Sequence, residues 1–398
     1  MKKIFLKSAC FPAIIFLLLF SGISFRCEAQ YPTDSVQISL LTASPGTEIY
    51  ALYGHSAIRI FNSLQGTDIV YNFGVFDFDT PNFAIKFTNG RLLYQLAKSS
   101  FNNFIYEYEQ SGQTVYQQNL NFSHHEKWQL INNLEVNYLP QNRYYRYDFF
   151  HDNCATRIRN IIAKSVDGTI QYDSSYIKKP ETFRDLIKIY QKPDPWLDFG
   201  THLLIGADAD STLKITDYMF LPGPMMDIYA HSYIVSKGNI RPVTQSTVAL
   251  LPGTLKPETP DPITSPLVIL GLIFILVLSI SFWGYRKNTH FKIIDQIILL
   301  LTGLLGLFIL LVWVGSAHEV LSRNYNIIWA SPLYVVFFVM LFYKAPPKWV
   351  AKASLVYGLL LILFIIISIF IPQSIPAAAY MIMGILIVRL VKVGLYFK

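Results

Sequence analysis

Residues 151–160 read His-Asp-Asn-Cys-Ala-Thr-Arg-Ile-Arg-Asn, and this stretch places a cysteine in what the pattern predicts to be the first turn of a helix. Asp152 or Asn153 can cap that helix by accepting a hydrogen bond from a free backbone N–H group. The isoleucines that follow recur at helical spacing, so one face of the helix can be buried. The position of the cysteine at this helix start is the main clue to the fold and the function of the domain.

Cys154 would lie at the positive end of the helix dipole, with Arg157 and Arg159 nearby. Positive charge favours the thiolate over the thiol, and the thiolate is the form that attacks a carbonyl carbon. Cys154 is therefore a candidate nucleophile. A buried structural cysteine is the alternative, because free cysteine is among the most buried residue types.

The other two of the three cysteines, Cys10 and Cys27, fall in a predicted secretory signal peptide over residues 1–29. That segment begins with lysines, continues with the apolar stretch Phe11–Phe25 and ends in small residues suited to cleavage. Once it is removed, the chain keeps one cysteine in an oxidising compartment. A structural disulfide within the exported chain is then excluded, and an unpaired thiol is retained.

The composition predicts a membrane part, since 52% of the 398 residues are hydrophobic and the mean hydropathy is +0.35. Residues 30–242 contain no apolar run long enough to cross a bilayer and are expected to form one exported domain; a proline-rich linker follows at 243–265. Five later stretches are long and apolar enough to cross, which predicts an all-α domain over residues 266–398. They are 266–284, 293–315, 327–343, 353–371 and 376–395.

The charges agree with export of the first domain across the inner, cytoplasmic membrane. If the first span runs inward, every Lys and Arg beyond residue 262 except Arg323 falls on the cytoplasmic side, as the positive-inside rule requires. The net charge of +7 comes from the signal segment and these loops, while the exported domain is acidic. The positive net charge therefore gives no reason to expect that the protein binds nucleic acid.

Two strands are predicted to bring a histidine and an amide together. Residues 54–61, Gly-His-Ser-Ala-Ile-Arg-Ile-Phe, alternate as a strand does, and a turn leads to a second strand at 69–75. His55 and Asn72 could then lie side by side. A histidine with a purely structural role is the alternative for His55.

Further elements are predicted between these strands and Cys154. Residues 105–108 and 114–120 alternate like strands, and Ser123 with Glu126 forms a capping box for a helix that ends near residue 137. His124 and His125 would be solvated residues of its first turn. No metal site is expected, because no acid or cysteine cluster accompanies them, and no phosphate loop or other cofactor motif is present.

The order His, polar residue, Cys resembles the circularly permuted papain-like fold of NlpC-type hydrolases and of the lecithin:retinol acyltransferase family. The chain is more closely similar to the Lnb family, the lipoprotein N-acyltransferases of Bacteroidota. The motifs that carry this resemblance are YGHSAIRI (53–60), YNFGVFDFDTPNF (71–83), HDNCATRIRN (151–160), MFLP (219–222) and HEVLSRNYNIIW (318–329). The resemblance implies an α+β domain of that permuted fold at 30–242, followed by the transmembrane helices.

The resemblance also implies acyl transfer in two displacements. Cys154, deprotonated with help from His55, would take an acyl chain from a phospholipid as a thioester and pass it to the α-amino group of a diacylglyceryl-cysteine lipoprotein. Asn72 would orient His55, although relatives often have a histidine at that third position. Backbone N–H groups at the helix start, including that of Cys154, would bind the oxyanion.

The loop at 316–327 is expected to lie under the exported domain. His318, Arg323, Asn324 and Asn326 are candidates for contacts with a lipid head group or the acceptor, and Arg323 is the candidate for phosphate. An ordinary interfacial loop is the alternative.

Two other functions stay open from the sequence. One is a hydrolase, in which the same Cys and His cut peptidoglycan amides or lipid esters with water in place of the amine. The other is a non-catalytic membrane protein whose papain-like domain binds a partner, with Cys154 merely buried.

Overall fold

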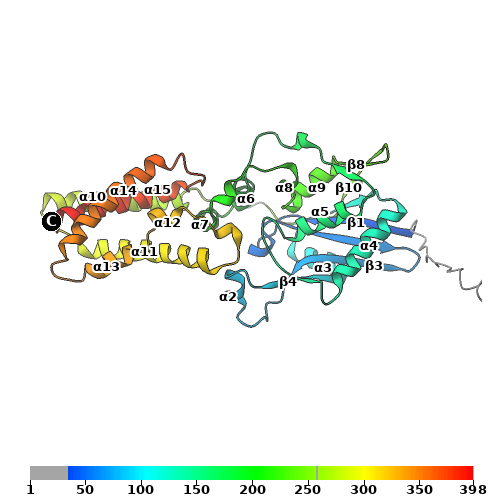
Figure 1. The fold of residues 1–398 in the computed structure, drawn as a ribbon, viewed down its shortest axis with the longest axis horizontal. Helices are drawn as coiled ribbons and strands as arrows, with labels where there is room; N and C mark the ends of the chain where they lie inside the picture. Colours follow the sequence, from blue (N-terminus) through cyan, green and yellow to red (C-terminus); the bar gives the residue numbers. More distant parts are fainter. Residues whose placement is uncertain (1–34, 257–258, 398) are drawn as a thin grey trace, which may run out of the picture.

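The protein is described here by a computed structural model that covers residues 35–256 and 259–397. Figure 1 shows an α+β domain at one end and, at the other, a bundle of helices that carries the C-terminus. The predicted signal peptide, with Cys10 and Cys27, lies outside the described residues.

One antiparallel sheet forms the centre of the α+β domain, with the strand order β10-β5-β1-β2-β3-β4-β6. Its strands are β1 (Val36–Ala43), β2 (His55–Asn62), β3 (Thr67–Val75), β4 (Leu93–Ser100), β5 (Val115–Leu120), β6 (Tyr144–Arg146) and β10 (Thr244–Leu251). A smaller sheet contains β7 (Thr169–Gln171), β8 (Tyr233–Ser236) and β9 (Asn239–Pro242). The two predicted strands after Gly54 are confirmed as β2 and β3, which pair with each other.

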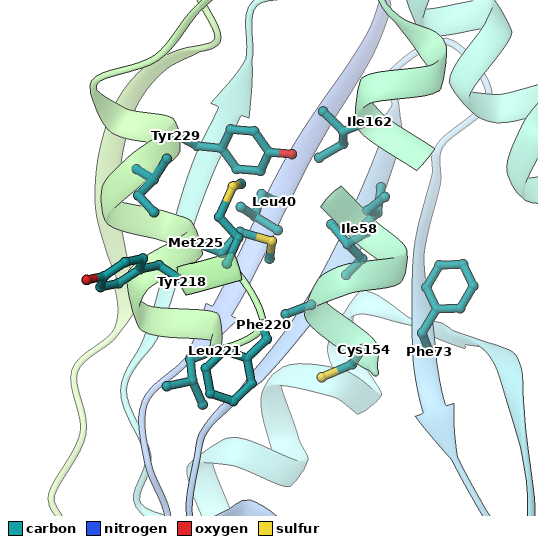
Figure 2. Close-up of a cluster of buried hydrophobic side chains, with 14 of the residues drawn as sticks. Leu40, Ile58, Phe73, Cys154, Ile162, Tyr218, Phe220, Leu221, Met225 and Tyr229 are labelled. Atoms are coloured by element: carbon teal, nitrogen blue, oxygen red, sulfur yellow. The ribbon is translucent and has the colours of Figure 1, made fainter. Parts of the chain in front are cut away.

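Helices cover both faces of the large sheet because its central strands are apolar on both sides. Leu40 and Ile58 belong to a core shared with α4 (His124–Tyr138), α5 (Cys154–Ser165) and α9 (Pro222–Ala230). Their neighbours Leu41 and Ala57 face the other way and pack with α3 (Phe101–Ser111). Figure 2 shows the first of these cores, with Cys154 at its edge.

Two of the predicted elements between β3 and Cys154 are confirmed and one is wrong. The capping box of Ser123 and Glu126 opens α4 as predicted, and residues 115–120 form β5. Residues 105–108 are not a strand, because they lie inside α3, where Phe104 and Tyr108 are buried one turn apart. The remaining helical segments of this domain are η2 (Ile49–Ala51), α2 (Phe83–Thr88), η3 (Ser174–Tyr176), α6 (Phe183–Gln191), α7 (Pro195–Leu204), η4 (Ala207–Asp210) and α8 (Ile215–Tyr218).

The predicted linker at 243–265 differs from the structure in its first half. Residues 244–251 form β10, which pairs with β5 at the edge of the large sheet. This segment alternates Thr, Ser and Val in the manner of an edge strand, and the prolines stand on either side of it, where they remove no ladder hydrogen bond. The exported domain therefore extends to about residue 251.

Within the described residues, four helices of the C-terminal part are long and apolar enough to cross a membrane. They are α10 (Pro266–Arg286), α11 (Lys292–Gly315), α14 (Lys348–Ile367) and α15 (Ala377–Tyr396). Between α11 and α14 the chain forms η5 (Glu319–Leu321), α12 (Asn326–Trp329) and α13 (Tyr334–Met340). The predicted span at 327–343 is therefore not one continuous helix.

The break in this segment contains Pro332, which lacks an N–H group and disfavours helical backbone at the residue before it. The segment nevertheless runs the length of the bundle. At one end, Asn326 donates to the carbonyl of Leu203 in the α+β domain; at the other, Lys292 at the start of α11 donates to the carbonyl of Tyr343. Within the described residues, this broken segment lies along the four helices that are long enough to cross.

A buried ion pair joins three of these passages at the end away from the α+β domain. Arg389 of α15 donates to Asp295 of α11 at 2.6 Å and to Ser281 of α10 at 2.9 Å. Arg389, which the charge pattern placed on the cytoplasmic side, thus lies inside the bundle. Each of the two buried charges compensates the other, and removal of either Arg389 or Asp295 would leave its partner as an uncompensated charge inside the bundle.

Candidate active site

Cys154 is the first residue of α5, as the sequence predicted. Asn153 is the cap: its side chain accepts from the N–H of Thr156, and the Thr156 hydroxyl accepts from the N–H of Asn153. The Asn153 amide also donates to the carbonyls of Phe149 and Phe220 at 2.7 and 2.8 Å. The MFLP stretch at residues 219–222 is buried, and through the carbonyl of Phe220 it helps to hold the start of α5 in place.

His55 is the first residue of β2 and hydrogen bonds with Cys154. Burial opposes a charge on either side chain, but the interaction between the two outweighs it. The result is that the pKa of the Cys154 thiol lies below its ordinary value and the pKa of His55 lies above its own. The geometry therefore favours a thiolate beside an imidazolium.

Asn72 lies beside His55, on the neighbouring strand β3. Nε2 of His55 is 3.3 Å from Oδ1 of Asn72, and Nδ2 of Asn72 donates to Ser99 Oγ on β4 at 3.3 Å. The hydrogen bond with Asn72 contributes to the raised pKa of His55, after the larger effects of burial and of Cys154. Asn72 is thus placed to orient the imidazole.

Two backbone N–H groups point at the sulfur of Cys154. They belong to Ser56 on β2 and Ala155 in the first turn of α5, and both help to lower the pKa of the thiol. The sequence predicted donors at the helix start, including the N–H of Cys154; Ser56 was missed because it comes from a different element. The pair forms a place where negative charge can be stabilised.

Tyr147 also hydrogen bonds with Cys154. It lies between β6 and α5, and burial followed by the nearby Cys154 raises its pKa well above the ordinary value, so it stays a hydroxyl donor. Gly74 lies beside this contact: its φ of +87° is a backbone conformation that favours glycine, and a Cβ added there would lie in ordinary contact, 3.4 Å from the ring of Tyr147. The sequence reasoning passed over Tyr147 because it is one of several tyrosines in an aromatic run.

The arginines after Cys154 do not act as predicted. Arg157 donates to Asp152 at 2.6 Å and lies over the ring of Tyr145, and Arg159 donates to the carbonyl of Thr216. Their charges are thereby occupied by other partners. His55 and backbone N–H groups, rather than these arginines, favour the thiolate.

Two of the four predicted binding residues in the loop after α11 are buried. Asn324 donates to the carbonyls of Leu203 and Leu204 at 2.7 and 2.9 Å, and Asn326 donates to that of Leu203 at 3.1 Å. Their amides satisfy the end of α7 and join the two domains. A role for either in binding a head group or the acceptor stays a prediction.

His318 and Arg323 lie in the same loop and are more exposed. Nε2 of His318 is 3.0 Å from the carbonyl oxygen of Phe87, and Arg323 pairs with Asp208 while its side chain stays 66% exposed. A role for either in binding lipid or acceptor stays a prediction.

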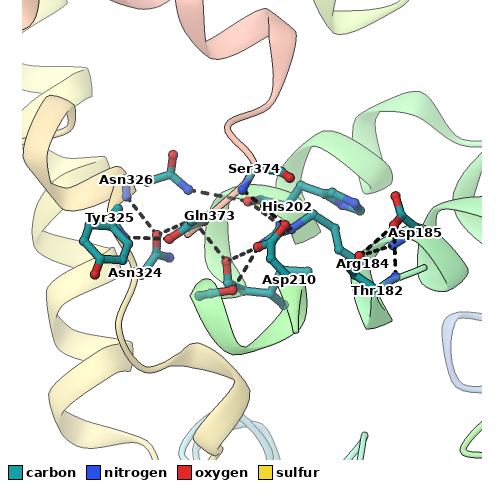
Figure 3. Close-up of polar contacts among 12 residues, drawn as sticks. Thr182, Arg184, Asp185, His202, Asp210, Asn324, Tyr325, Asn326, Gln373 and Ser374 are labelled. Atoms are coloured by element: carbon teal, nitrogen blue, oxygen red, sulfur yellow. Dashed lines mark hydrogen bonds and ion pairs between the residues drawn. The ribbon is translucent and has the colours of Figure 1, made fainter. Parts of the chain in front are cut away.

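Figure 3 shows the polar network at the junction of the two domains. Arg184 of α6 pairs with Asp210 at 2.9 Å and donates to the carbonyls of Ile205 and Gly206. Gln373, which precedes α15, donates to Asn324 at 3.1 Å. The α+β domain is therefore held against the membrane helices by buried hydrogen bonds.

The fold and the site define a class of protein: an α+β domain with a cysteine–histidine pair, held on a membrane-spanning helical bundle. Comparison with protein families identifies which one. Residues 25–189 match the family model of the Lnb N-terminal periplasmic domain, and residues 258–398 match that of the Lnb transmembrane domain. The chain belongs to the Lnb family, whose members are membrane proteins with a periplasmic N-terminal domain. No curated protein and no solved structure matched the chain.

Proposed function

We propose that the protein is an acyltransferase that moves an acyl chain from a phospholipid, through a thioester on Cys154, to the α-amino group of diacylglyceryl-cysteine lipoproteins. The observation that carries the proposal is the hydrogen-bonded pair of Cys154 and His55, whose pKa values are shifted toward thiolate and imidazolium. Membership of the Lnb family supports the lipoprotein as the substrate class. The basic loops at the far end of the bundle support placement in the inner membrane.

In the first displacement, the thiolate of Cys154 attacks an ester carbonyl of the phospholipid. The developing oxyanion would be stabilised by the N–H groups of Ser56 and Ala155. The C–O bond then breaks, and the leaving oxygen takes the proton of the His55 imidazolium, which gives a lysophospholipid and an acyl thioester.

In the second displacement, the amine of the lipoprotein attacks the thioester carbonyl. His55, now neutral, takes the proton that the amine loses, and the C–S bond breaks to restore the thiolate. Asn72 holds the imidazole between these two roles, because one ring nitrogen stays bonded to its amide oxygen. The products are an amide-linked acyl chain and the resting enzyme.

The chain order of these residues supports the circularly permuted papain-like fold as a further part of the proposal. His55 on β2 and Asn72 on β3 precede Cys154 at the start of α5. In that fold the helix that carries the cysteine follows the strands that carry its partners.

Mass spectrometry of lipoprotein N-termini in cells with and without this protein tests the proposal. We expect a third, amide-linked acyl chain only in cells with the wild-type protein, and diacylated N-termini in cells that carry Cys154→Ser or His55→Ala. Leu64→Ala is the control, because Leu64 lies in the turn at the far end of β2. Triacylated N-termini in cells that carry Cys154→Ser would contradict the proposal, and unchanged N-termini with altered peptidoglycan or free fatty acid would favour a hydrolase.

A further inference from the structure

Large apolar side chains lie exposed on the α+β domain, on η2, on α2 and on the segment before α2. Tyr50, Phe78, Ile85 and Phe87 are 66%, 63%, 65% and 48% exposed. The rings of Tyr50 and Phe78 are 6.3 Å apart, so η2 contributes to the same surface. A contiguous apolar surface of this kind marks a site of interaction with a protein or a membrane.

Hydrogen bonds hold α2 directly against the end of a membrane span. Ser316, the residue after α11, donates to the carbonyl of Thr88 at 3.0 Å, and the N–H of Ala317 donates to Asn89 at 2.8 Å. Gly90 also approaches the backbone of Ala317 so closely that an added Cβ would touch it. α2 therefore lies beside the end of α11 that is nearer to the α+β domain (Figure 1), where a helix long enough to span a bilayer would reach the membrane surface.

A row of aromatic rings connects this surface with the thiol. The rings of Phe87, Phe83, Phe76, Tyr94 and Tyr147 follow one another with centroids 6.0, 5.8, 5.1 and 4.5 Å apart. The last of them, Tyr147, hydrogen bonds with Cys154. Phe83, Phe76 and Tyr147 are partly exposed, so the row forms an apolar wall that a hydrocarbon chain can follow.

Charged side chains of both signs border the apolar surface: Asp77 and Asp79 stand on either side of Phe78 in the sequence, Lys86 lies within α2, and Arg91 follows it. An apolar surface with a charged rim fits the interface of a bilayer, where the apolar side chains enter the acyl region and the charged side chains stay among the head groups.

We propose that the exposed apolar side chains Phe78, Ile85 and Phe87 enter the periplasmic leaflet of the membrane while the charged residues between them stay at its polar surface, and that the aromatic row guides an acyl chain of a phospholipid from that leaflet to Cys154. The occupant of the exposed surface is thus the hydrocarbon of bilayer lipids. The second half of the statement rests on the proposed acyl transfer, whereas the first half, the immersion of α2, does not.

A nitroxide spin label at Ile85→Cys tests the immersion directly. The full chain, with Cys10, Cys27 and Cys154 replaced by Ser, is placed in vesicles of phosphatidylethanolamine and phosphatidylglycerol. Leu64→Cys is the matched control, because Leu64 is 69% exposed and lies at the end of β2 away from His55. We expect the label at 85 to collide more often with oxygen than with a water-soluble nickel chelate, and the label at 64 to show the reverse. Equal nickel accessibility at both positions would overturn the proposal.

Ile85→Asp tests whether phospholipid reaches the acyl route through the surface of α2, in the otherwise unchanged protein. Two rates are measured: release of lysophospholipid from vesicles of the same lipids, and cleavage of water-soluble p-nitrophenyl acetate. We expect the ratio of the first rate to the second to fall roughly tenfold or more, since an apolar side chain that would enter the acyl region is replaced by a charge. Ile85→Leu should restore the ratio, and Leu64→Asp should not change it.

An unchanged ratio in Ile85→Asp would overturn the acyl route. If the wild-type protein released no lysophospholipid at all, the proposed function would fail, while the spin-label result would still decide whether α2 lies in the membrane.

Discussion

Nε2 of His55 lies 3.3 Å from Oδ1 of Asn72, across the pair of strands β2 and β3. An amide oxygen can only accept, so Nε2 of His55 carries the hydrogen in this contact. In the neutral ring the other nitrogen, Nδ1, then has a free lone pair, which can take the proton of Cys154 or of an incoming amine. The relationship between these two side chains therefore determines which nitrogen does the chemistry.

Asn72→Ala should lower the turnover number by roughly tenfold to a hundredfold, less than the loss from removing His55 itself. The imidazole stays present but is free to rotate. Because the hydrogen bond with Asn72 raises the pKa of His55, the pH at which His55 loses its proton should also fall in this variant. A pH–rate profile measures both effects. A loss as complete as that of Cys154→Ser would show that Asn72 has a more direct part.

Alkylation of Cys154 by iodoacetamide should show how strongly His55 favours the thiolate. His55 lowers the pKa of the thiol, so the alkylation rate of the wild-type protein should reach half its maximum at a pH below the ordinary thiol range. In His55→Ala the thiol loses the interaction that lowers its pKa, while burial still raises that pKa. The pH at which alkylation reaches half its maximal rate should therefore move upward. A midpoint that does not move would mean that the two side chains are not coupled.

Tyr147→Phe should reduce the rate of acyl-enzyme formation by about tenfold, because one hydroxyl donor to Cys154 is lost while the ring stays. The alkylation midpoint of Cys154 should rise slightly for the same reason. Tyr144→Phe is a suitable control, since Tyr144 is 49% exposed. Equal rates for the wild-type protein and Tyr147→Phe would remove Tyr147 from the mechanism.

Gly206→Ala should disrupt the junction between the domains. An added Cβ would lie well inside contact distance of the Ser322 carbonyl oxygen, and that backbone is held by hydrogen bonds from Gly206 and Ala207 to the loop after α11. Gly200→Ala is the control, because nothing lies within 4 Å of a Cβ at that position. We expect a lower melting temperature in detergent and faster proteolysis near residue 206 only in Gly206→Ala. Identical behaviour of the two variants would argue against a rigid junction.

The local parts of the site could be predicted from the sequence. Asn153 and Thr156 form a capping box whose geometry depends only on spacing, so the helix start at Cys154 is visible without a structure. The short turn after β2 makes β3 its neighbour, and this places Asn72 beside His55.

The parts that depend on distant segments could not be predicted. Tyr147 meets Cys154 beside Gly74 of another strand, a neighbourhood that only the folded chain brings together. Asn324 and Asn326 look like solvated loop residues, but the end of α7, more than a hundred residues earlier, buries them. β10 was assigned to the linker because prolines stand on both sides of it. The strand forms because its one neighbour at the edge of the sheet, β5, comes from a distant part of the chain.

The most direct test of the account is to isolate the acyl-enzyme. The full-length protein is incubated with phospholipid and no acceptor, and mass spectrometry then looks for an acyl chain on Cys154. We predict a thioester that hydroxylamine releases at neutral pH, formed together with lysophospholipid and absent from Cys154→Ser. A diacylated lipopeptide with a free N-terminal amine should discharge it to an amide-linked third chain, whereas the N-acetylated lipopeptide should not. Free fatty acid released at the same rate with and without the amine, or no acyl group on Cys154 at all, would contradict the account.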